Sequence, residues 1–121
     1  MVVPDVKREA LASLATERLL FLYMVKHIVC FKLKDSTDSE KKAAKEMLLS
    51  MVGKVDMIKE IEVGTDFLGS ARSYDVFLSV TVESREALEA YQNDEYHVGV
   101  VKKYIGEHTA GAVAIDYEIQ A

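Results

Sequence analysis

Residues 25–34 read VKHIVCFKLK, and their side chains alternate between two kinds. One set is apolar apart from a histidine: Val25, His27, Val29, Phe31 and Leu33. The other set mixes apolar and basic residues: Lys26, Ile28, Cys30, Lys32 and Lys34. Because successive side chains of a β-strand point to opposite sides, this period of two predicts a strand with one face toward a core.

The segments that follow repeat this kind of pattern in a recognisable order. Residues 35–53 have helical spacing of apolar residues, a Thr37–Glu40 capping box at the start and Gly53 at the end. Alternation returns in 59–66 and 74–82, short helices are expected over 84–92 and about 95–105, and 112–119 reads as a last strand. This order predicts an α+β, ferredoxin-like fold: a four-stranded antiparallel sheet with helices on one face.

The second sheet face is expected to hold a mixed patch. We place Val113, Ile115, Tyr117 and Ile119 of the last strand toward the helices. The opposite face then holds apolar Ile28, Cys30, Phe77 and Ala114 beside polar Glu60, Glu62, Ser79, Thr81 and Asp116. A solvated face with scattered apolar residues is one interpretation. A second copy packed sheet on sheet would cover the patch, and we predict this homodimer.

The first 23 residues differ from the rest of the chain. VKREALASLATERLLFL, residues 6–22, is rich in helix-forming residues and follows Pro4, which a first helical turn tolerates. The apolar run LLFLY is shorter than the roughly 7–15 residues of a signal-peptide core. We therefore expect an N-terminal helical extension over 1–23 and a compact domain over 24–121.

The composition of the chain argues against several classes of binding partner and cofactor. Fifteen basic and twenty acidic residues give a net charge of −5, which disfavours binding to nucleic acid or to an anionic membrane. The single cysteine, Cys30, cannot form an internal disulfide, and this favours a cytoplasmic location. No histidine, cysteine or acidic residues have zinc-site spacing, so the sequence predicts no metal site and no cofactor.

Four stretches carry a resemblance to a known family: MVKHIVCFKLKD (24–35), RSYDVFLSVTVESREALEAY (72–91), YHVGVVKKYI (96–105) and VAIDYEI (113–119). Together they resemble the stress-responsive A/B barrel (Dabb) family over about residues 24–119. The resemblance implies ferredoxin-like subunits that pair into a dimeric α+β barrel. It also leaves open a cation held by backbone carbonyls near Val52, Val55 and Ile58.

The same resemblance implies a site between sheet and helices. One plant branch of the family is a polyketide cyclase, and its matching residues imply that His97 is a general base and Tyr91 orients the substrate. His27, Phe31 and Leu78, on the face toward the helices, would line a pocket for a small hydrophobic ligand. Two positions depart from the family pattern: Asp94–Glu95 replaces a frequent His-Pro pair, and Val76 replaces a pocket histidine of the cyclase.

Alternative functions remain open at this stage. Another branch of the family forms a highly stable ring, which suggests a non-enzymatic, oligomeric stress or stability protein. Ferredoxin-like dimers also include cofactor-free monooxygenases and haem-degrading proteins, although a shared fold is weak support for a shared function. A continuous cavity lined by His27, Tyr91 and His97 would favour a ligand-binding protein or enzyme, and a filled core would favour the stability protein.

Overall fold

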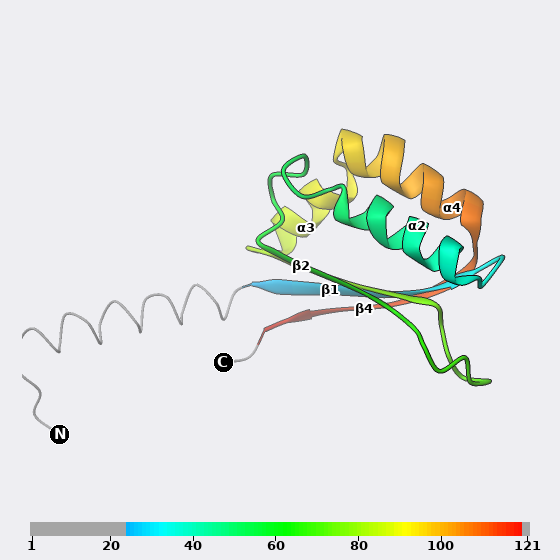
Figure 1. Ribbon diagram of the computed structural model, residues 1–121. Helices are drawn as coiled ribbons and strands as arrows, with labels where there is room; N and C mark the ends of the chain where they lie inside the picture. Colours follow the sequence, from blue (N-terminus) through cyan, green and yellow to red (C-terminus); the bar gives the residue numbers. More distant parts are fainter. Residues whose placement is uncertain (1–23, 120–121) are drawn as a thin grey trace, which may run out of the picture.

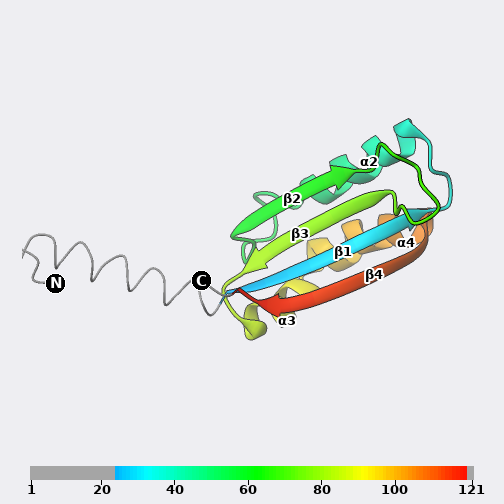
Figure 2. The same cartoon turned by 90° about the horizontal axis from the view of Figure 1, so that it is seen from below.

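A computed structural model describes residues 24–119 of the chain. The expected helical extension over 1–23 lies outside the described residues. Four antiparallel strands form one sheet in the order β2-β3-β1-β4 (Figure 2). The strands are β1 (Val25–Leu33), β2 (Glu60–Thr65), β3 (Val76–Val82) and β4 (Thr109–Glu118). The strand order and the connections confirm the predicted ferredoxin-like α+β fold, and the sheet is open rather than closed.

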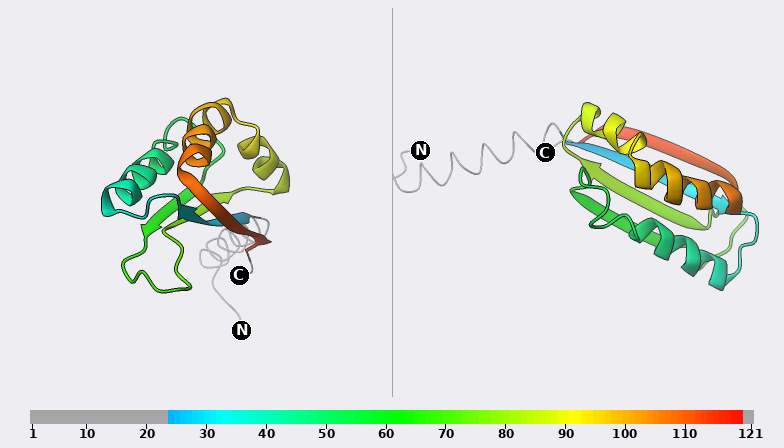
Figure 3. Two further views of the ribbon diagram at one scale, coloured as in Figure 1. Left: turned by 90° about the vertical axis from the view of Figure 1, so that its right-hand side faces the viewer. Right: turned by 90° about the horizontal axis from the view of Figure 1, so that it is seen from above.

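The helices all lie on one face of this sheet (Figures 1 and 3). They are α2 (Asp38–Leu49), α3 (Arg85–Gln92), the π-helix η1 (His97–Lys102) and α4 (Lys103–His108). Side-chain caps start two of them: Thr37 Oγ1 accepts from the Glu40 amide at 3.2 Å, and Ser84 Oγ accepts from the Ala87 amide at 3.0 Å. Among the described residues, no helix combines the length and hydrophobicity that crossing a bilayer requires.

The hydrophobic core lies between the sheet and the helices. β1 contributes Val25, Val29 and Leu33, and these residues pack against the buried side of β3 and against α2. The largest fully buried side chains are Tyr91, Leu48, Met51, Val80, Val82, Val101 and Thr81. Gly53, with φ of +79°, ends the turn after α2 in a conformation that glycine adopts without strain.

The predicted orientation of the last strand is wrong. Directly opposed residues of antiparallel strands share a face, and Ala114 pairs with Val29 while Asp116 pairs with His27. Both therefore face the helices, and Val113, Ile115 and Tyr117 lie on the opposite face instead. The register with β1 decides this, and alternation within 112–119 could not reveal it because both sets contain apolar residues.

This correction makes the uncovered face more apolar than expected. We call the following six residues the open-face patch: Ile28, Cys30, Phe77, Val113, Ile115 and Tyr117. Figure 2 views the sheet from this side, and no described element covers it. The three residues that β4 contributes are 50%, 60% and 43% exposed in the single chain.

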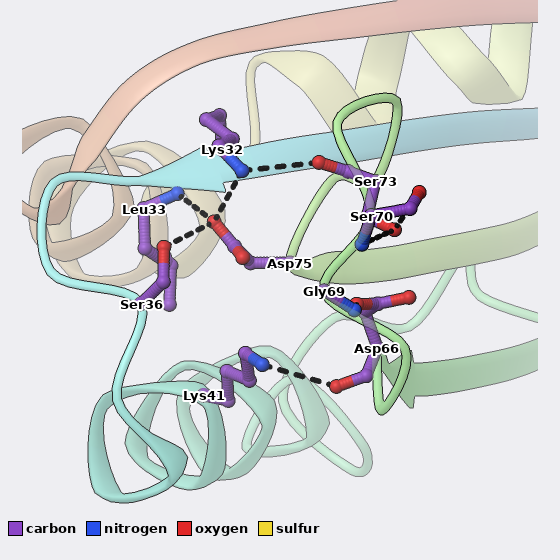
Figure 4. A network of polar contacts seen from close by, with 9 residues as sticks. All are labelled: Lys32, Leu33, Ser36, Lys41, Asp66, Gly69, Ser70, Ser73 and Asp75. Atoms are coloured by element: carbon purple, nitrogen blue, oxygen red, sulfur yellow. Dashed lines mark hydrogen bonds and ion pairs between the residues drawn. The ribbon is translucent and has the colours of Figure 1, made fainter.

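A polar network holds the β2–β3 loop against the end of β1 (Figure 4). The buried Asp75 carboxylate accepts hydrogen bonds from the Leu33 amide at 2.7 Å and from Ser36 Oγ at 3.0 Å. Lys32 Nζ lies 3.8 Å from the same carboxylate. The loop is thus fixed to the strand that carries His27, and it leaves Phe67 96% exposed.

The segment after α3 differs in detail from the expected helix over about 95–105. It is helical from Glu95, as expected, but takes a π-helical form over His97–Lys102 and continues as α4 to His108, which stacks on Tyr104 at a ring distance of 3.9 Å. His108 therefore ends a helix that continues beyond the expected end at about residue 105. A π-helix has more residues per turn than an α-helix, so it changes which side chains face the sheet.

Candidate functional site

A cavity of about 490 Å³ lies between the helices and the centre of the sheet. Its apolar wall comes from β1, β3 and the helices: Val29, Phe31, Leu48, Leu78, Val101 and Ile105. Its polar lining residues are His27, Tyr91, Gln92, Asn93, His97 and Lys102. Volume and lining are in the range of small-molecule sites, in which a mostly apolar wall carries a few polar groups.

His27 is held in place by an acidic residue of the neighbouring strand. Its side chain is 12% exposed, and Nδ1 is hydrogen-bonded to Asp116 Oδ1. The pairing of β1 with β4 places these two residues directly opposite each other. A carboxylate bonded to one imidazole nitrogen fixes the tautomer, so the other nitrogen is left for a different partner.

Tyr91 lies close to both histidine rings. Its ring centroid is 5.7 Å from that of His27 and 4.3 Å from that of His97, on which it stacks. The residue is fully buried, and its hydroxyl donates to Met51 Sδ at 3.8 Å. Burial raises the pKa of the Tyr91 hydroxyl far above its usual range, and Asp94 adds to the shift. The hydroxyl is therefore protonated at neutral pH and acts as a donor.

His97 begins η1 directly after a short acidic turn. Asp94 Oδ1 accepts from the backbone amides of Tyr96 at 2.9 Å and of His97 at 3.0 Å, and this fixes the start of the helix. The buried Nδ1 of His97 has no hydrogen-bond partner among residues 24–119. Burial lowers the pKa of the imidazole and Lys102 lowers it further, while the Gln92 carbonyl opposes the shift. The ring is therefore neutral at neutral pH.

All five residues that the sequence analysis placed at the site line this one cavity: Tyr91, His97, His27, Phe31 and Leu78. Two further residues were missed. Asp116 was assigned to the wrong sheet face together with the rest of its strand, and the pairing of β4 with β1 places it beside His27. Lys102 reaches the cavity from η1, and one lysine in a helix gives no signal for this placement.

Within residues 24–119, no group of three or more His, Cys, Asp or Glu side chains is arranged to hold a metal ion. The acid–base groups of the cavity are thus imidazole, phenol and ammonium side chains, with one carboxylate behind His27. Such a set can bind a polar group, move a proton, or do both.

Comparisons with solved structures find the same fold. A dimeric protein of unknown function with a ferredoxin-like fold from Bacteroides fragilis is 29% identical, with a TM-score of 0.67 over 79% of this chain and 96% of that chain. A Dabb family protein from Mesorhizobium loti is 20% identical, with a TM-score of 0.63 over 81% and 98% of the two chains. A hydroxynitrile lyase from Passiflora edulis is 16% identical, with a TM-score of 0.66 over 82% and 95%.

A search of curated protein sequences finds no match to this chain. The family comparison is positive, because the model of the stress responsive A/B barrel domain matches residues 25–119. This match covers every strand and helix described above, including the three that supply His27, Tyr91 and His97. The chain belongs to the stress responsive A/B barrel domain (Dabb) family.

Proposed function

We propose that the protein binds a small, largely apolar molecule in this cavity and removes a proton from it. The observation that carries the proposal is the cluster of His27, Tyr91 and His97 rings in the wall of a 490 Å³ cavity. A filled core at this place would have favoured a purely structural role. A hydroxynitrile lyase with the same fold is an example in which this architecture supports catalysis.

His97 is the proposed general base. A base must be unprotonated at working pH, and burial lowers the pKa of this imidazole. A proton taken from the ligand would be held on the ring, where Asp94 lies close enough to favour the charged form. The ring stacks on Tyr91, which limits its rotation and keeps its nitrogen atoms in place.

Tyr91 is the proposed orienting group. Its hydroxyl is protonated, and its partner in the structure is a thioether sulfur, which is a weak acceptor. A carbonyl or enolate oxygen of a ligand would be a better acceptor, so the hydroxyl would exchange one partner for the other at little loss. A donor placed at a developing oxyanion stabilises it.

His27 and Asp116 form a second polar group beside the Tyr91 ring. Because Asp116 engages Nδ1, Nε2 is the atom that we assign to the ligand. Phe31 and Leu78 would contact the apolar body of the ligand on the same wall. The polar side chains of His27, Tyr91 and His97 would thus hold a ligand at more than one point.

We further propose a homodimer through the open-face patch. The solved neighbours from Bacteroides fragilis and Thermobifida fusca are dimeric, which supports pairing of subunits. Ile28, Cys30 and Phe77 stay in the proposed interface, and Val113, Ile115 and Tyr117 replace Ala114. Packing the open-face patch against a second copy would remove its apolar side chains from water.

A cytoplasmic location also stays a prediction, which rests on the single cysteine.

A metabolite screen by thermal shift tests the site, because a ligand that binds only the folded state raises the melting temperature. Each hit is then followed for conversion with the wild-type protein, His97→Gln and Tyr91→Phe. We expect both variants to bind the ligand, the first to lose conversion by about 100-fold or more and the second by less. Conversion at an unchanged rate in both variants would contradict the catalytic roles.

The exposed open-face patch favours a second candidate function, a non-enzymatic stress or stability protein that works by assembly alone. In that case the screen gives no ligand, and filling the cavity does not harm the protein. Val101→Phe would then raise or preserve the melting temperature and leave the assembly unchanged. A ligand whose binding is lost in Val101→Phe would contradict this second candidate.

A further inference from the structure

We propose that Lys102 makes the cavity selective for molecules that carry a carboxylate at one end of an apolar body. This inference rests on the proposed function, because it names the class of ligand for the same cavity. It concerns binding, so it can hold whether or not the ligand is converted.

Lys102 is the only lysine, arginine, aspartate or glutamate among the twelve residues that line the cavity. The others are apolar, amide, phenol or imidazole side chains. In a mostly apolar site, a single charge has a large influence on which ligand is accepted, since an oppositely charged group gains an ion pair and a like charge is repelled.

The carboxylates near the cavity already have partners. Asp116 is hydrogen-bonded to His27, and Asp94 accepts from two backbone amides at the start of η1. Lys102 lines the cavity, and its Nζ has no ion pair or hydrogen bond within residues 24–119. The charge of Lys102 is thus available to a ligand.

The charge also acts inside the cavity. Lys102 lowers the pKa of the His97 imidazole, second only to burial, so its field reaches the ring of the proposed base. An anion bound beside Lys102 would lie close to His97 and on the same side of the cavity. Lys102 thus lines the same cavity as His97 and acts on its imidazole.

The cavity is polarised from its mouth to its floor. Lys102, Gln92 and Asn93 are exposed, whereas Leu48, Leu78 and Val101 are buried. A carboxylate at the mouth would keep part of its hydration, which avoids most of the penalty of burying a charge. The apolar body would be removed from water against the floor, and that burial supplies most of the affinity.

Matched pairs of compounds test the inference. Octanoate is compared with octanamide, and phenylpropanoate with its amide, by calorimetry or thermal shift. The proteins are the wild type, Lys102→Gln, Lys102→Arg and Lys103→Gln. Lys103 is the control because it is exposed, follows Lys102 directly and does not line the cavity.

For wild type, we expect the carboxylate to bind about threefold to tenfold more tightly than its amide, the range of a solvent-accessible ion pair. Lys102→Gln should bring this ratio close to one, and both Lys102→Arg and Lys103→Gln should retain it. Equal binding of acid and amide by the wild type would overturn the inference and leave the cavity proposal intact. If no compound of either pair binds, both proposals fail for this ligand class. Lys102-dependent binding of the acids would uphold the inference, and the catalytic roles are tested separately by the conversion assays with His97→Gln and Tyr91→Phe.

Discussion

The two faces of the sheet use the same strands and differ in what covers them. On the helix side, Val29, Leu78 and Val80 are buried by the chain's own helices. On the other side, Ile115 is 60% exposed and Val113 is 50% exposed, although they are as apolar as the buried residues of the helix side. The chain's own helices therefore bury the centre of one face, and the apolar residues of the other face stay exposed in the single chain.

β4 shows this contrast within one strand. Its large apolar residues, Val113, Ile115 and Tyr117, point away from the helices, and its helix side carries Ala112, Ala114 and Asp116. Ala112 and Ala114 are exposed even though they face the helix layer, so the helices do not cover this edge strand. The chemistry of the protein is then expected on the helix side and the assembly on the other.

The largest effect is expected on the helix side. Leu48→Ala removes a buried side chain that packs between α2 and the sheet, and we expect a loss of about 3 kcal/mol in the free energy of unfolding, measured by urea denaturation. Val52→Ala, at a position that is 61% exposed just after the same helix, should change it by less than about 0.5 kcal/mol. A loss below about 1 kcal/mol for Leu48→Ala would mean that the core described here does not carry the stability.

A charge on the open face should affect assembly rather than the fold of the single chain. Val113→Asp places a carboxylate in the open-face patch, and we expect the dimer to weaken by about 2 kcal/mol, or roughly 30-fold in dissociation constant. Sedimentation or light scattering should then show the wild type at twice the chain mass of 13.5 kDa and the variant shifting toward the monomer.

The matched control is Val52→Asp, which makes the same change at a valine that is also exposed, 61% against 50% for Val113, and lies away from the sheet. It should leave the mass at that of the dimer. A wild-type protein that is monomeric at micromolar concentration would contradict the interface, and so would an equal effect of both substitutions.

Most of the fold followed from the sequence because its central strands alternate strongly. In 25–33 and 76–82 one set of side chains is clearly the more apolar, so the face toward the helices is unambiguous. In 112–117 both sets are apolar, Ala112 and Ala114 against Val113 and Ile115, and larger side chains were taken to mean the core. The pairing register with β1, which a single sequence does not contain, decides the opposite.

The site was predictable to the same extent. His27, Tyr91 and His97 follow from the expected faces of one strand and two helices, and the structure brings them to one cavity. Asp116 was not predicted at the site because the orientation of β4 was predicted wrongly. Lys102 depends on the π-helical turn from His97, because the additional residue per turn changes which side chain reaches the cavity.

The smallest expected effect is a pH dependence that belongs to His97. The groups that act on it are Lys102 and His27, which lower its pKa together with burial, and Asp94 and the Gln92 carbonyl, which raise it. Because the net shift is downward, the unfolded state binds the proton more tightly than the folded state does. The free energy of unfolding should therefore fall as the pH decreases through about 6.5, the ordinary pKa of histidine, and the loss should level off below the pKa of His97 in the folded state.

His97→Gln removes this contribution. Its plot of unfolding free energy against pH should therefore be flatter between about pH 5 and pH 8 than that of the wild type, by at most one proton or about 1.4 kcal/mol per pH unit. Lys102→Gln should give an intermediate curve, since it removes one cause of the shift and leaves burial, the larger one. Parallel curves for the wild type and His97→Gln would mean that His97 is not held neutral by its surroundings, and the helix side of the sheet would then lose its proposed base.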